Sequence, residues 1–285
     1  DSILSMLCLP RSLVVLGSGV IGSEYASIFS MLGVKVTLID KGPRPLMFME
    51  AELTDEFVKH FRSYGGDFKS ESMVESVSWD GVSQVTTCLQ GGETIQSDKV
   101  LVCQGRLANV ERLGLETIGI EQGKYGHIVV DEHYATNVPG IYAVGDVIGP
   151  PALASCSMEQ GRRAMYHALG TDPGLPFELV PMGIYSVPEM ASVGLTEEQA
   201  SQKYDGKILV GRAPFSEVSR ALISGSSIGL LKLVASSEGD NRLLGVQAVG
   251  EDATDLVHAG EMVLIFEGSV HIFLENIMNF PTLGD

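Results

Sequence analysis

The chain reads Leu13-Val14-Val15-Leu16-Gly17-Ser18-Gly19-Val20-Ile21-Gly22 close to its start. The apolar run before the first glycine is typical of a strand buried on both faces of a parallel sheet. From Val20 to Leu32 apolar residues recur at helical spacing, and Gly33 predicts the end of that helix. Residues 34–39 predict a second strand, so the first forty residues predict a strand-helix-strand unit.

The spacing of the three glycines in this turn suits a dinucleotide. Gly17 would allow the tight turn, Gly19 would let a pyrophosphate approach the backbone, and Gly22 would let the helix pack closely on the strand. A phosphate at the helix N-terminus is stabilised by unpaired N–H groups and by the helix dipole. Asp40 follows the second strand, where a carboxylate can accept hydrogen bonds from an adenine ribose. The alternative is an ordinary glycine-rich turn in which Asp40 caps the next segment.

The residues after the second strand leave the choice of nucleotide open. Asp40 favours NAD because a carboxylate would repel the 2′-phosphate of NADP. Lys41 and Arg44 lie just beyond it and could reach such a phosphate, so the sequence permits use of both nucleotides. The alternative is that both are solvated loop charges.

The rest of the chain predicts further helices and strands on both sides of a linker. Residues 52–64 predict a helix, residues 72–79, 82–89 and 93–96 predict an antiparallel β-meander, and residues 99–103 predict a buried strand that leads to Gly105. Residues 141–144 predict a strand that ends at Gly145-Asp146, and residues 152–169 predict a helix. Residues 170–176 form the best linker. Beyond it we expect a separate α+β unit, with strands at 183–186, 208–213, 229–234 and 243–249 and helices at 254–266 and 272–278.

Composition excludes several classes of function. The net charge is −17, which disfavours nucleic acid and anionic membrane surfaces as partners. No apolar stretch is long enough to span a membrane, and the first residues do not resemble a secretory signal. The cysteines and histidines show no metal-ligand or redox spacing, which favours a reducing cytoplasm and predicts no metal site.

These motifs together resemble the pyridine nucleotide-disulfide oxidoreductases, which are flavin-dependent enzymes. The resemblance rests on residues 17–24, the meander, Gly105-Arg106, residues 141–146, and residues 183–197, which are similar to the start of the family's dimerisation domain. It spans essentially the whole chain. Residues 1–6, 22–29 and 142–155 are most similar to the transhydrogenases of this family.

The resemblance implies a set of cofactor-binding residues. The residues that match the family's NAD(P) site are Gly17, Gly19, Ile21, Gly22, Glu24, Asp40, Val74 and Gly105. Glu24 would face the nicotinamide, or pair with a lysine on the flavin side outside this chain; without the resemblance it would be an ordinary surface acid. The residues that match the FAD site are Asp146, Ala152, Leu153, Ala154 and Ser155.

The sequence also departs from the family pattern. Only one glycine fingerprint is present, so the family's own FAD-binding unit is missing, and with it the region that would carry a redox-active cysteine pair. Members that reduce disulfides have a His-Pro-Thr with an acid–base histidine, whereas here Phe280 precedes Pro281 and Thr282. Because phenylalanine cannot transfer a proton, this difference disfavours a thiol–disulfide substrate.

We therefore predict an α/β protein with a Rossmann-like NAD(P)-binding domain and meander at residues 1–129, a remnant of an FAD domain at 130–176, and an α+β dimerisation domain at 177–285. The expected function of the parent enzyme is hydride transfer between NADPH and NAD through FAD, with no acid, base or nucleophile in this chain. The alternatives are a dihydrolipoyl dehydrogenase-like disulfide reductase, and a non-catalytic dinucleotide-binding and dimerisation module. We expect a cytoplasmic homodimer, and we expect the chain by itself to be inactive.

Overall fold

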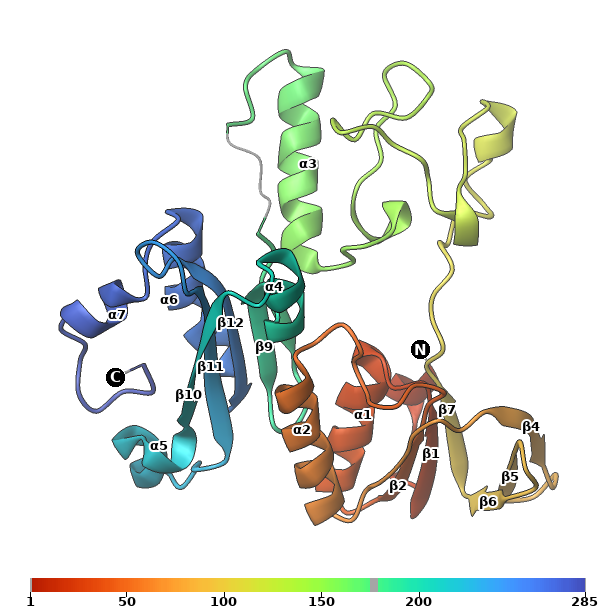
Figure 1. Ribbon diagram of the computed structural model, residues 1–285. Helices are drawn as coiled ribbons and strands as arrows, with labels where there is room; N and C mark the ends of the chain where they lie inside the picture. The colour runs from red at the N-terminus through yellow and green to blue at the C-terminus, as the bar shows by residue number, and fades with distance from the viewer. Residues whose placement is uncertain (1, 175–178, 285) are drawn as a thin grey trace. The chain divides into compact units, whose positions relative to one another are not determined.

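The protein is described by a computed structural model that covers residues 2–174 and 179–284 (Figure 1). The chain folds into two compact units. The first unit combines residues up to 104 with the residues from 181 onwards, and the second unit consists of residues 105–180.

The first unit opens with the predicted strand-helix-strand arrangement, which is confirmed. Its parallel sheet has the order β3-β2-β1-β7. The strands are β1 (Ser12–Leu16), β2 (Lys35–Ile39), β3 (Asp67–Lys69) and β7 (Lys99–Val102), and the helices are α1 (Val20–Met31) and α2 (Ala51–Ser63). Gly33, with φ +84°, lies just beyond the C-cap of α1, as the sequence predicts.

Strand β1 is apolar at every position after its first because both of its faces are covered. Leu13 and Val15 pack in one core cluster with Phe29 of α1 and Phe57 of α2. Val14 and Leu16 pack on the opposite face with Leu89 of the meander. That meander is antiparallel, as predicted, and consists of β4 (Val74–Trp79), β5 (Val85–Leu89) and β6 (Thr94–Ser97).

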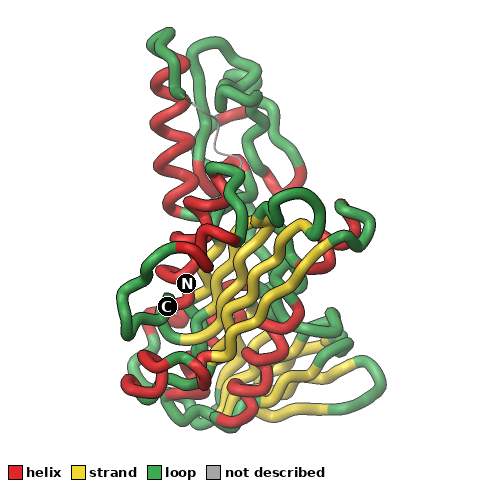
Figure 2. Tube along the Cα trace, turned by 60° about the vertical axis from the view of Figure 1, so that its left-hand side comes forward, coloured by secondary structure: helices red, strands yellow, loops and turns green. Residues whose placement is uncertain are grey.

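The second sheet of this unit is antiparallel, with the order β10-β11-β12-β9-β8, and its strands lie side by side in Figure 2. They are β8 (Met182–Ile184), β9 (Met190–Gly194), β10 (Ile208–Pro214), β11 (Gly229–Ser236) and β12 (Leu243–Gly250). The helices are α4 (Glu197–Lys203), α5 (Ser219–Ser224), α6 (Ala253–Ile265) and α7 (His271–Glu275). Ile184, Met190 and Val249 belong to the same core cluster as α1 and α2, so a single core joins the two sheets.

The α+β organisation after residue 180 is confirmed. Strand β9 and helices α4 and α5 were not predicted from the sequence, and the last helix ends earlier than predicted. Helix α4 has a clear signal in the sequence. Thr196 accepts from the backbone N–H of Gln199, and the Gln199 side chain accepts in return from the Thr196 N–H. This reciprocal capping box follows directly from the order Thr-Glu-Glu-Gln.

The second unit contains one long helix, α3 (Ala154–Ala168), and a small core built from loops. The buried Gln160 of α3 accepts a hydrogen bond of 2.7 Å from the backbone N–H of Gly145. The strand predicted at residues 141–144 is wrong: Tyr142 makes only an isolated antiparallel bridge with Ala135. An apolar run becomes a strand only where a neighbouring strand pairs with it, and the described residues of this unit contain none.

The compact units do not test the predicted division at residues 129 and 176, which stays a prediction. The second of these boundaries, and the end of the predicted linker, fall on residues 175–178, outside the described residues. In the described part of the chain, no helix has the length and apolar character needed to cross a lipid bilayer.

Candidate nucleotide-binding site

The three glycines of the first turn have three different surroundings. Gly17 has φ +96°, and a Cβ atom on it would lie 2.6 Å from the carbonyl oxygen of Cys103. A Cβ atom on Gly22 would lie 1.8 Å from the carbonyl oxygen of Gly17. A Cβ atom on Gly19 would meet nothing within 4 Å. Gly17 and Gly22 are therefore required by the protein's own packing, whereas Gly19 leaves open space beside the backbone.

That open space lies at the N-terminus of α1. Gly19 is the N-cap residue, and no side chain caps the helix there. Ser23, in the first turn, donates through its Oγ to the carbonyl oxygen of Ser18 and holds the turn against the helix. An exposed, uncapped helix N-terminus next to a glycine without neighbours has the donors and the room that a pyrophosphate requires.

Asp40 lies directly beside this turn. One carboxylate oxygen accepts from the backbone N–H of Ser18 at 2.6 Å, and the other accepts from the N–H of Gly42 at 2.8 Å. The second contact is the capping interaction that the sequence left open as an alternative. Because a carboxylate has about four acceptor positions, the half-buried Asp40 can still accept from a ribose.

The structure separates the two basic residues that follow. Lys41 is exposed. Arg44 is half-buried, and its guanidinium donates to the carbonyl oxygens of Leu46, Met47 and Met49 and to the hydroxyl of Thr54. Arg44 is thus not a solvated loop charge; it holds the loop between β2 and α2 in shape.

Glu24, in α1, has a partner that the sequence did not suggest. Its carboxylate accepts from the backbone N–H of Tyr185 at 2.9 Å, just after β8. One turn along the helix, the hydroxyl oxygen of Ser27 accepts from the backbone N–H of Val187 at 3.0 Å. The helix that follows the glycine turn is therefore joined by two hydrogen bonds to the segment that connects β8 and β9.

The remaining predicted nucleotide residues lie around the sheet. Ile21 is half-buried in the first turn of α1. Val74 is the first residue of β4 and packs against the face of the parallel sheet that carries Val14 and Leu16. Gly105 has φ +119° and follows β7 by three residues. Cys103, before it, has its pKa raised by burial.

The second unit contains a pocket of about 430 Å³. Two of the predicted flavin residues, Asp146 and Ala152, line it together with Arg106 and His127. Leu153 is the N-cap of α3, and Ala154 and Ser155 are exposed in the first turn of that helix. Asp146 is exposed at the start of a short 3-10 helix, where its carboxylate is free to meet a ligand hydroxyl.

Comparison with known families matches most of the chain. Residues 2–161 match the family described as pyridine nucleotide-disulphide oxidoreductase, and residues 180–285 match the dimerisation domain of the same family. The chain is 41% identical, over 291 residues, to a soluble pyridine nucleotide transhydrogenase of Marinobacter nauticus. It is 42% identical, over 285 residues, to a protein of the same name from Mycobacterium bovis. In both cases the match covers all of this chain, and 62% and 60% of the relative, respectively.

The chain is also similar in fold to solved structures. The fold is similar to that of the HOCl-induced flavoprotein disulfide reductase RclA from Escherichia coli, with a TM-score of 0.91 and 27% identity, covering 99% of this chain and 64% of RclA. It is also similar to LpdA from Mycobacterium tuberculosis, with a TM-score of 0.88 and 28% identity, covering 98% of this chain and 61% of LpdA.

The chain thus spans about three fifths of the length of the curated relatives that it matches. The resemblance inferred from the motifs is confirmed along both compact units. On this evidence the chain belongs to the pyridine nucleotide-disulphide oxidoreductase family.

Proposed function

We propose that the protein carrying this chain is a flavin-dependent transhydrogenase that moves hydride between NADPH and NAD. The observation that carries the proposal is the geometry of the first turn, where two glycines are demanded by packing and the third leaves open space at an uncapped helix N-terminus. The names of the relatives from Marinobacter nauticus and Mycobacterium bovis support the same activity.

In this proposal, both nucleotides use the same turn, one after the other. The N–H groups at the start of α1 bind the pyrophosphate, and Asp40 accepts from the adenosine ribose. Lys41, which is exposed, is the residue available to a 2′-phosphate, because the guanidinium of Arg44 is bonded to its own loop. The chain therefore binds and orients the nucleotide and does no proton chemistry.

We further propose that Asp146 and residues 152–155 contribute to binding FAD. The residues present fit this role: Asp146 and Ala152 line a pocket, and Asp146 is exposed, so its carboxylate can accept from a ligand hydroxyl. When bound, FAD supplies the group that accepts and returns the hydride. The first turn of α3 would provide a helix dipole that stabilises negative charge nearby.

Phe280 distinguishes this reading from a disulfide reductase. Its side chain is exposed, and the resemblance implies that it matches the position at which the family's disulfide-reducing members carry an acid–base histidine. A phenylalanine cannot exchange a proton with a thiol, whereas hydride exchange needs no such group. The second candidate activity is disulfide reduction, and it is favoured by the fold similarity to RclA, which is named a flavoprotein disulfide reductase.

The test uses the full-length flavoprotein and three assays: hydride transfer from NADPH to an NAD analogue, reduction of lipoamide, and reduction of glutathione disulfide. The expected result is nucleotide-to-nucleotide transfer with no disulfide turnover above background. Turnover of either disulfide without transfer between nucleotides would overturn the proposal in favour of the second candidate.

For the chain alone we propose a binding module. The nucleotide turn and its supporting core lie in one compact unit, so titration with NADH is expected to saturate. We expect little or no FAD to be retained, because the chain has a single glycine fingerprint and therefore one pyrophosphate cradle. Flavin absorbance after purification distinguishes the binding module from an active enzyme.

We also propose a homodimer formed through the domain after residue 180, which matches the family's dimerisation domain. Large apolar side chains are exposed on and after the last two helices of the described chain. They are Met262, Ile265, Phe266, Ile272, Leu274 and Ile277. Large apolar side chains that gather on one surface are typical of an interface that a second subunit covers, and the proposal assigns these side chains to such a surface.

A further inference from the structure

A row of polar side chains crosses the antiparallel sheet. Across β10, β11, β12 and β9, Arg212 pairs with Lys232, Lys232 with Gln247, and Gln247 with Ser192. Residues directly opposite one another in an antiparallel sheet point to the same face, so these four side chains form one line. Lys232 and Gln247 are fully buried, which is unusual for a lysine in the middle of a sheet.

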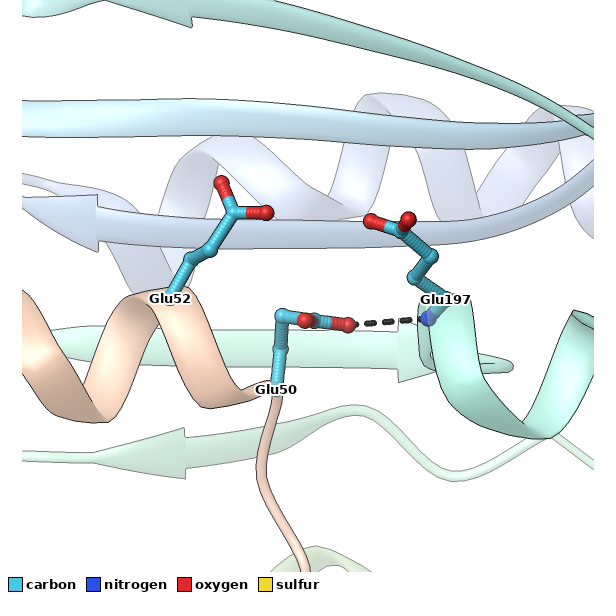
Figure 3. A group of neighbouring side chains, drawn as sticks. All are labelled: Glu50, Glu52 and Glu197. Atoms are coloured by element: carbon cyan, nitrogen blue, oxygen red, sulfur yellow. Dashed lines mark hydrogen bonds between the residues drawn. The ribbon is translucent and has the colours of Figure 1, made fainter.

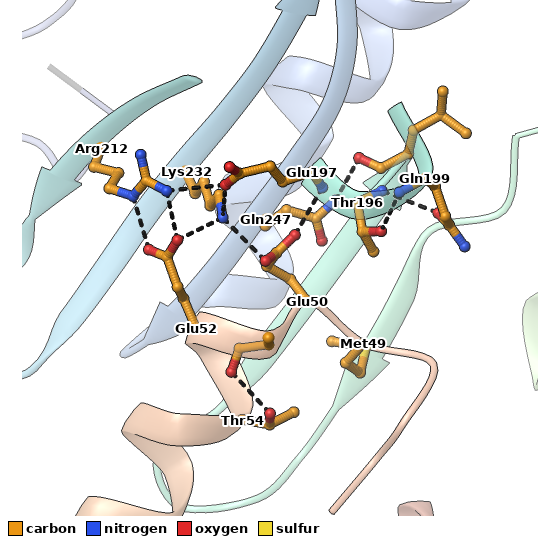
Figure 4. A network of polar contacts seen from close by, with 12 residues as sticks. Met49, Glu50, Glu52, Thr54, Thr196, Glu197, Gln199, Arg212, Lys232 and Gln247 are labelled. Carbon is orange, nitrogen blue, oxygen red and sulfur yellow. Dashed lines mark hydrogen bonds and ion pairs between the residues drawn. The ribbon is translucent and has the colours of Figure 1, made fainter. Parts of the chain in front are cut away.

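The row meets the start of α2 and of α4, as Figure 4 shows. The Nζ atom of Lys232 lies 3.0 Å from Glu50, 2.7 Å from Glu52 and 2.6 Å from Glu197. Arg212 adds a forked pair of hydrogen bonds to Glu52, at 2.8 and 2.5 Å, and contacts Glu197 at 2.9 Å. We call these five residues the Lys232 cluster.

The three carboxylates converge on the lysine. Figure 3 shows them approaching one another from the start of α2 and the start of α4, with Glu50 accepting from the backbone N–H of Glu197 at 2.8 Å. Their oxygens lie within 4.8 Å of one another, a spacing that could hold a metal ion. The ammonium of Lys232 lies within 3.0 Å of all three, so the cation among them is the protein's own.

The charges of the cluster depend on one another. Three carboxylates face two cations, and Glu50 and Lys232 are buried. Burial acts to lower the pKa of Lys232, but hydrogen bonds to Glu197, Glu52 and Glu50 outweigh it and hold that pKa above its usual value. Removing the lysine would leave Glu50 charged and buried without a counterion, which is strongly unfavourable.

Glu50 is also the last residue of the loop that supports the glycine turn. Within that loop, the backbone N–H of Leu46 donates to the carbonyl oxygen of Ser18 at 3.0 Å. Arg44 donates to the carbonyl oxygen of Met49 at 3.0 Å, and Ser192 of the polar row contacts the sulfur of Met49 at 3.6 Å. A continuous set of bonds therefore runs from Ser18 in the turn to the polar row.

From this set of bonds we infer that Lys232 is a positioning residue for the nucleotide: by holding Glu50 and Glu52 on the antiparallel sheet, it fixes the loop that supports the phosphate-binding turn and Asp40. The inference rests on the proposed nucleotide site. Residues of the part that matches the dimerisation domain would thus influence nucleotide affinity indirectly, through a side chain that does not contact the nucleotide.

The experiment measures nucleotide binding by the full-length flavoprotein with Lys232→Met. The dissociation constant for NADH is expected to rise about ten-fold, which corresponds to about 1.4 kcal/mol. The rate of flavin reduction at saturating NADH is expected to stay within about two-fold of the wild type, because the reacting groups are untouched. A merely structural role would lower the melting temperature without this separation of affinity from rate.

Two further variants make the result specific. Glu50→Gln/Lys232→Met removes both buried charges and keeps an acceptor for the Glu197 N–H, so it is expected to recover much of the stability that Lys232→Met loses. Its dissociation constant for NADH is expected to stay about ten-fold raised, because no ammonium group holds the loop on the sheet. Val257→Ala, in the buried face of α6, lowers stability by creating a cavity and is expected to leave the NADH dissociation constant unchanged.

The inference is overturned if Lys232→Met binds NADH as the wild type does at a temperature where both are folded, or if Val257→Ala weakens binding equally. If Lys232→Met does not fold, Glu52→Gln, in the more exposed half of the cluster, carries the same test with an expected two- to three-fold loss of about 0.4–0.7 kcal/mol. A wild-type enzyme that binds no nucleotide would instead contradict the proposed function itself.

Discussion

The space around each glycine of the first turn determines what a methyl group would do there. On Gly22 it would overlap the carbonyl oxygen of Gly17, and the helix would have to move away from the strand. On Gly19 it would meet no protein atom, and φ −70° is accessible to alanine. The two positions should therefore respond differently, although they belong to one motif.

We predict that Gly22→Ala destabilises the protein by about 2–4 kcal/mol, as other overpacked or strained sites do. Gly19→Ala should cost about 1 kcal/mol or less and should reduce NADH affinity at least ten-fold, since its methyl group enters the space meant for the pyrophosphate. Urea unfolding and NADH titration of both variants check this. Equal loss of stability in the two would contradict the assignment.

Substitutions of the two basic residues after Asp40 should also have different effects on binding and stability. Lys41→Ala is expected to weaken NADPH binding about three-fold, leaving NADH binding and the melting temperature unchanged, because an exposed charge pair contributes up to about 1 kcal/mol. Arg44→Ala removes hydrogen bonds to three carbonyl oxygens and a hydroxyl, so it should lower stability by about 2–3 kcal/mol and weaken both nucleotides. Titration of each variant with both nucleotides tests the assignment.

At this scale the sequence predicted the position of the turn well and its partners poorly. The spacing of Gly17, Gly19 and Gly22 predicts a turn before a helix, and the structure has that turn. The contact of Glu24 with Tyr185 joins residues 161 positions apart, and the contact of Lys232 with Glu50 joins residues 182 apart. Local periodicity contains no information about such pairs.

Among the elements, those with their own local signal were predictable. Helices α1 and α2 and the meander follow from periodicity and glycine turns, and β1 follows from its apolar run. The false strand at residues 141–144 has a similar apolar pattern but only one bridge partner, which the sequence does not reveal. Helix α4 was missed, although its capping box is readable from Thr196 and Gln199.

The cap of α4 leads to a prediction. Thr196→Ala removes the acceptor for the Gln199 N–H and should reduce stability by about 1 kcal/mol. Thr196→Ser keeps the hydroxyl and should behave as the wild type does. Because α4 begins at Glu197, which belongs to the Lys232 cluster, Thr196→Ala should also weaken NADH binding slightly. Chemical denaturation and titration of both variants test these outcomes.

Glu52, at the start of α2, should make the free energy of unfolding depend on pH. The hydrogen bond from Arg212, assisted by Lys232, lowers the pKa of Glu52 from 4.5 to about 2. As the pH falls below 4.5, the carboxylate of Glu52 is therefore protonated in the unfolded chain before it is protonated in the folded protein. The contribution of Glu52 is fully present above about pH 5 and is lost progressively as the pH falls towards 2.

We expect Glu52→Gln to unfold at a lower urea concentration than the wild type at pH 7, and the difference should shrink at pH 3. Glu75→Gln, on the exposed side of β4, serves as the control and should follow the wild type at both values. A difference between Glu52→Gln and wild type that is independent of pH would contradict the ion-pair assignment.

On the scale of the whole molecule, the two units have cores of very different size. The core of the first unit joins α1, α2 and both sheets. In the described part of the second unit, the loop core is a cluster of five buried side chains, Val110, Leu115, Ile120, Ile128 and Ala143. We predict that this chain unfolds in two thermal transitions, in which the second unit unfolds first. Gln160→Leu, which leaves the Gly145 N–H without its partner, should lower only the first transition. Calorimetry of both proteins tests this.

The subunit arrangement can be tested through a side chain at the end of α6. Phe266 is 81% exposed and lies close in sequence to Met262 and Ile265, which are also exposed. Phe266→Glu should shift the full-length protein from dimer towards monomer without changing its helix content, because a charge on an apolar patch opposes association. Light scattering coupled to size-exclusion chromatography, with circular dichroism, measures both effects. An unchanged dimer would place the interface elsewhere.

A lysine shared by three acids has a consequence for redesign of this protein. Buried ion pairs are weak contributors to stability, and replacing a whole set with hydrophobic residues often raises the melting temperature. Apolar contacts, however, are not directional, so they allow the loop before α2 to shift against the sheet, whereas the ion pairs fix its position. A redesigned protein with apolar residues in place of Glu50, Glu52, Glu197, Arg212 and Lys232 should therefore have a higher melting temperature and a larger dissociation constant for NADH. Selection for heat resistance alone would then favour sequences with impaired affinity.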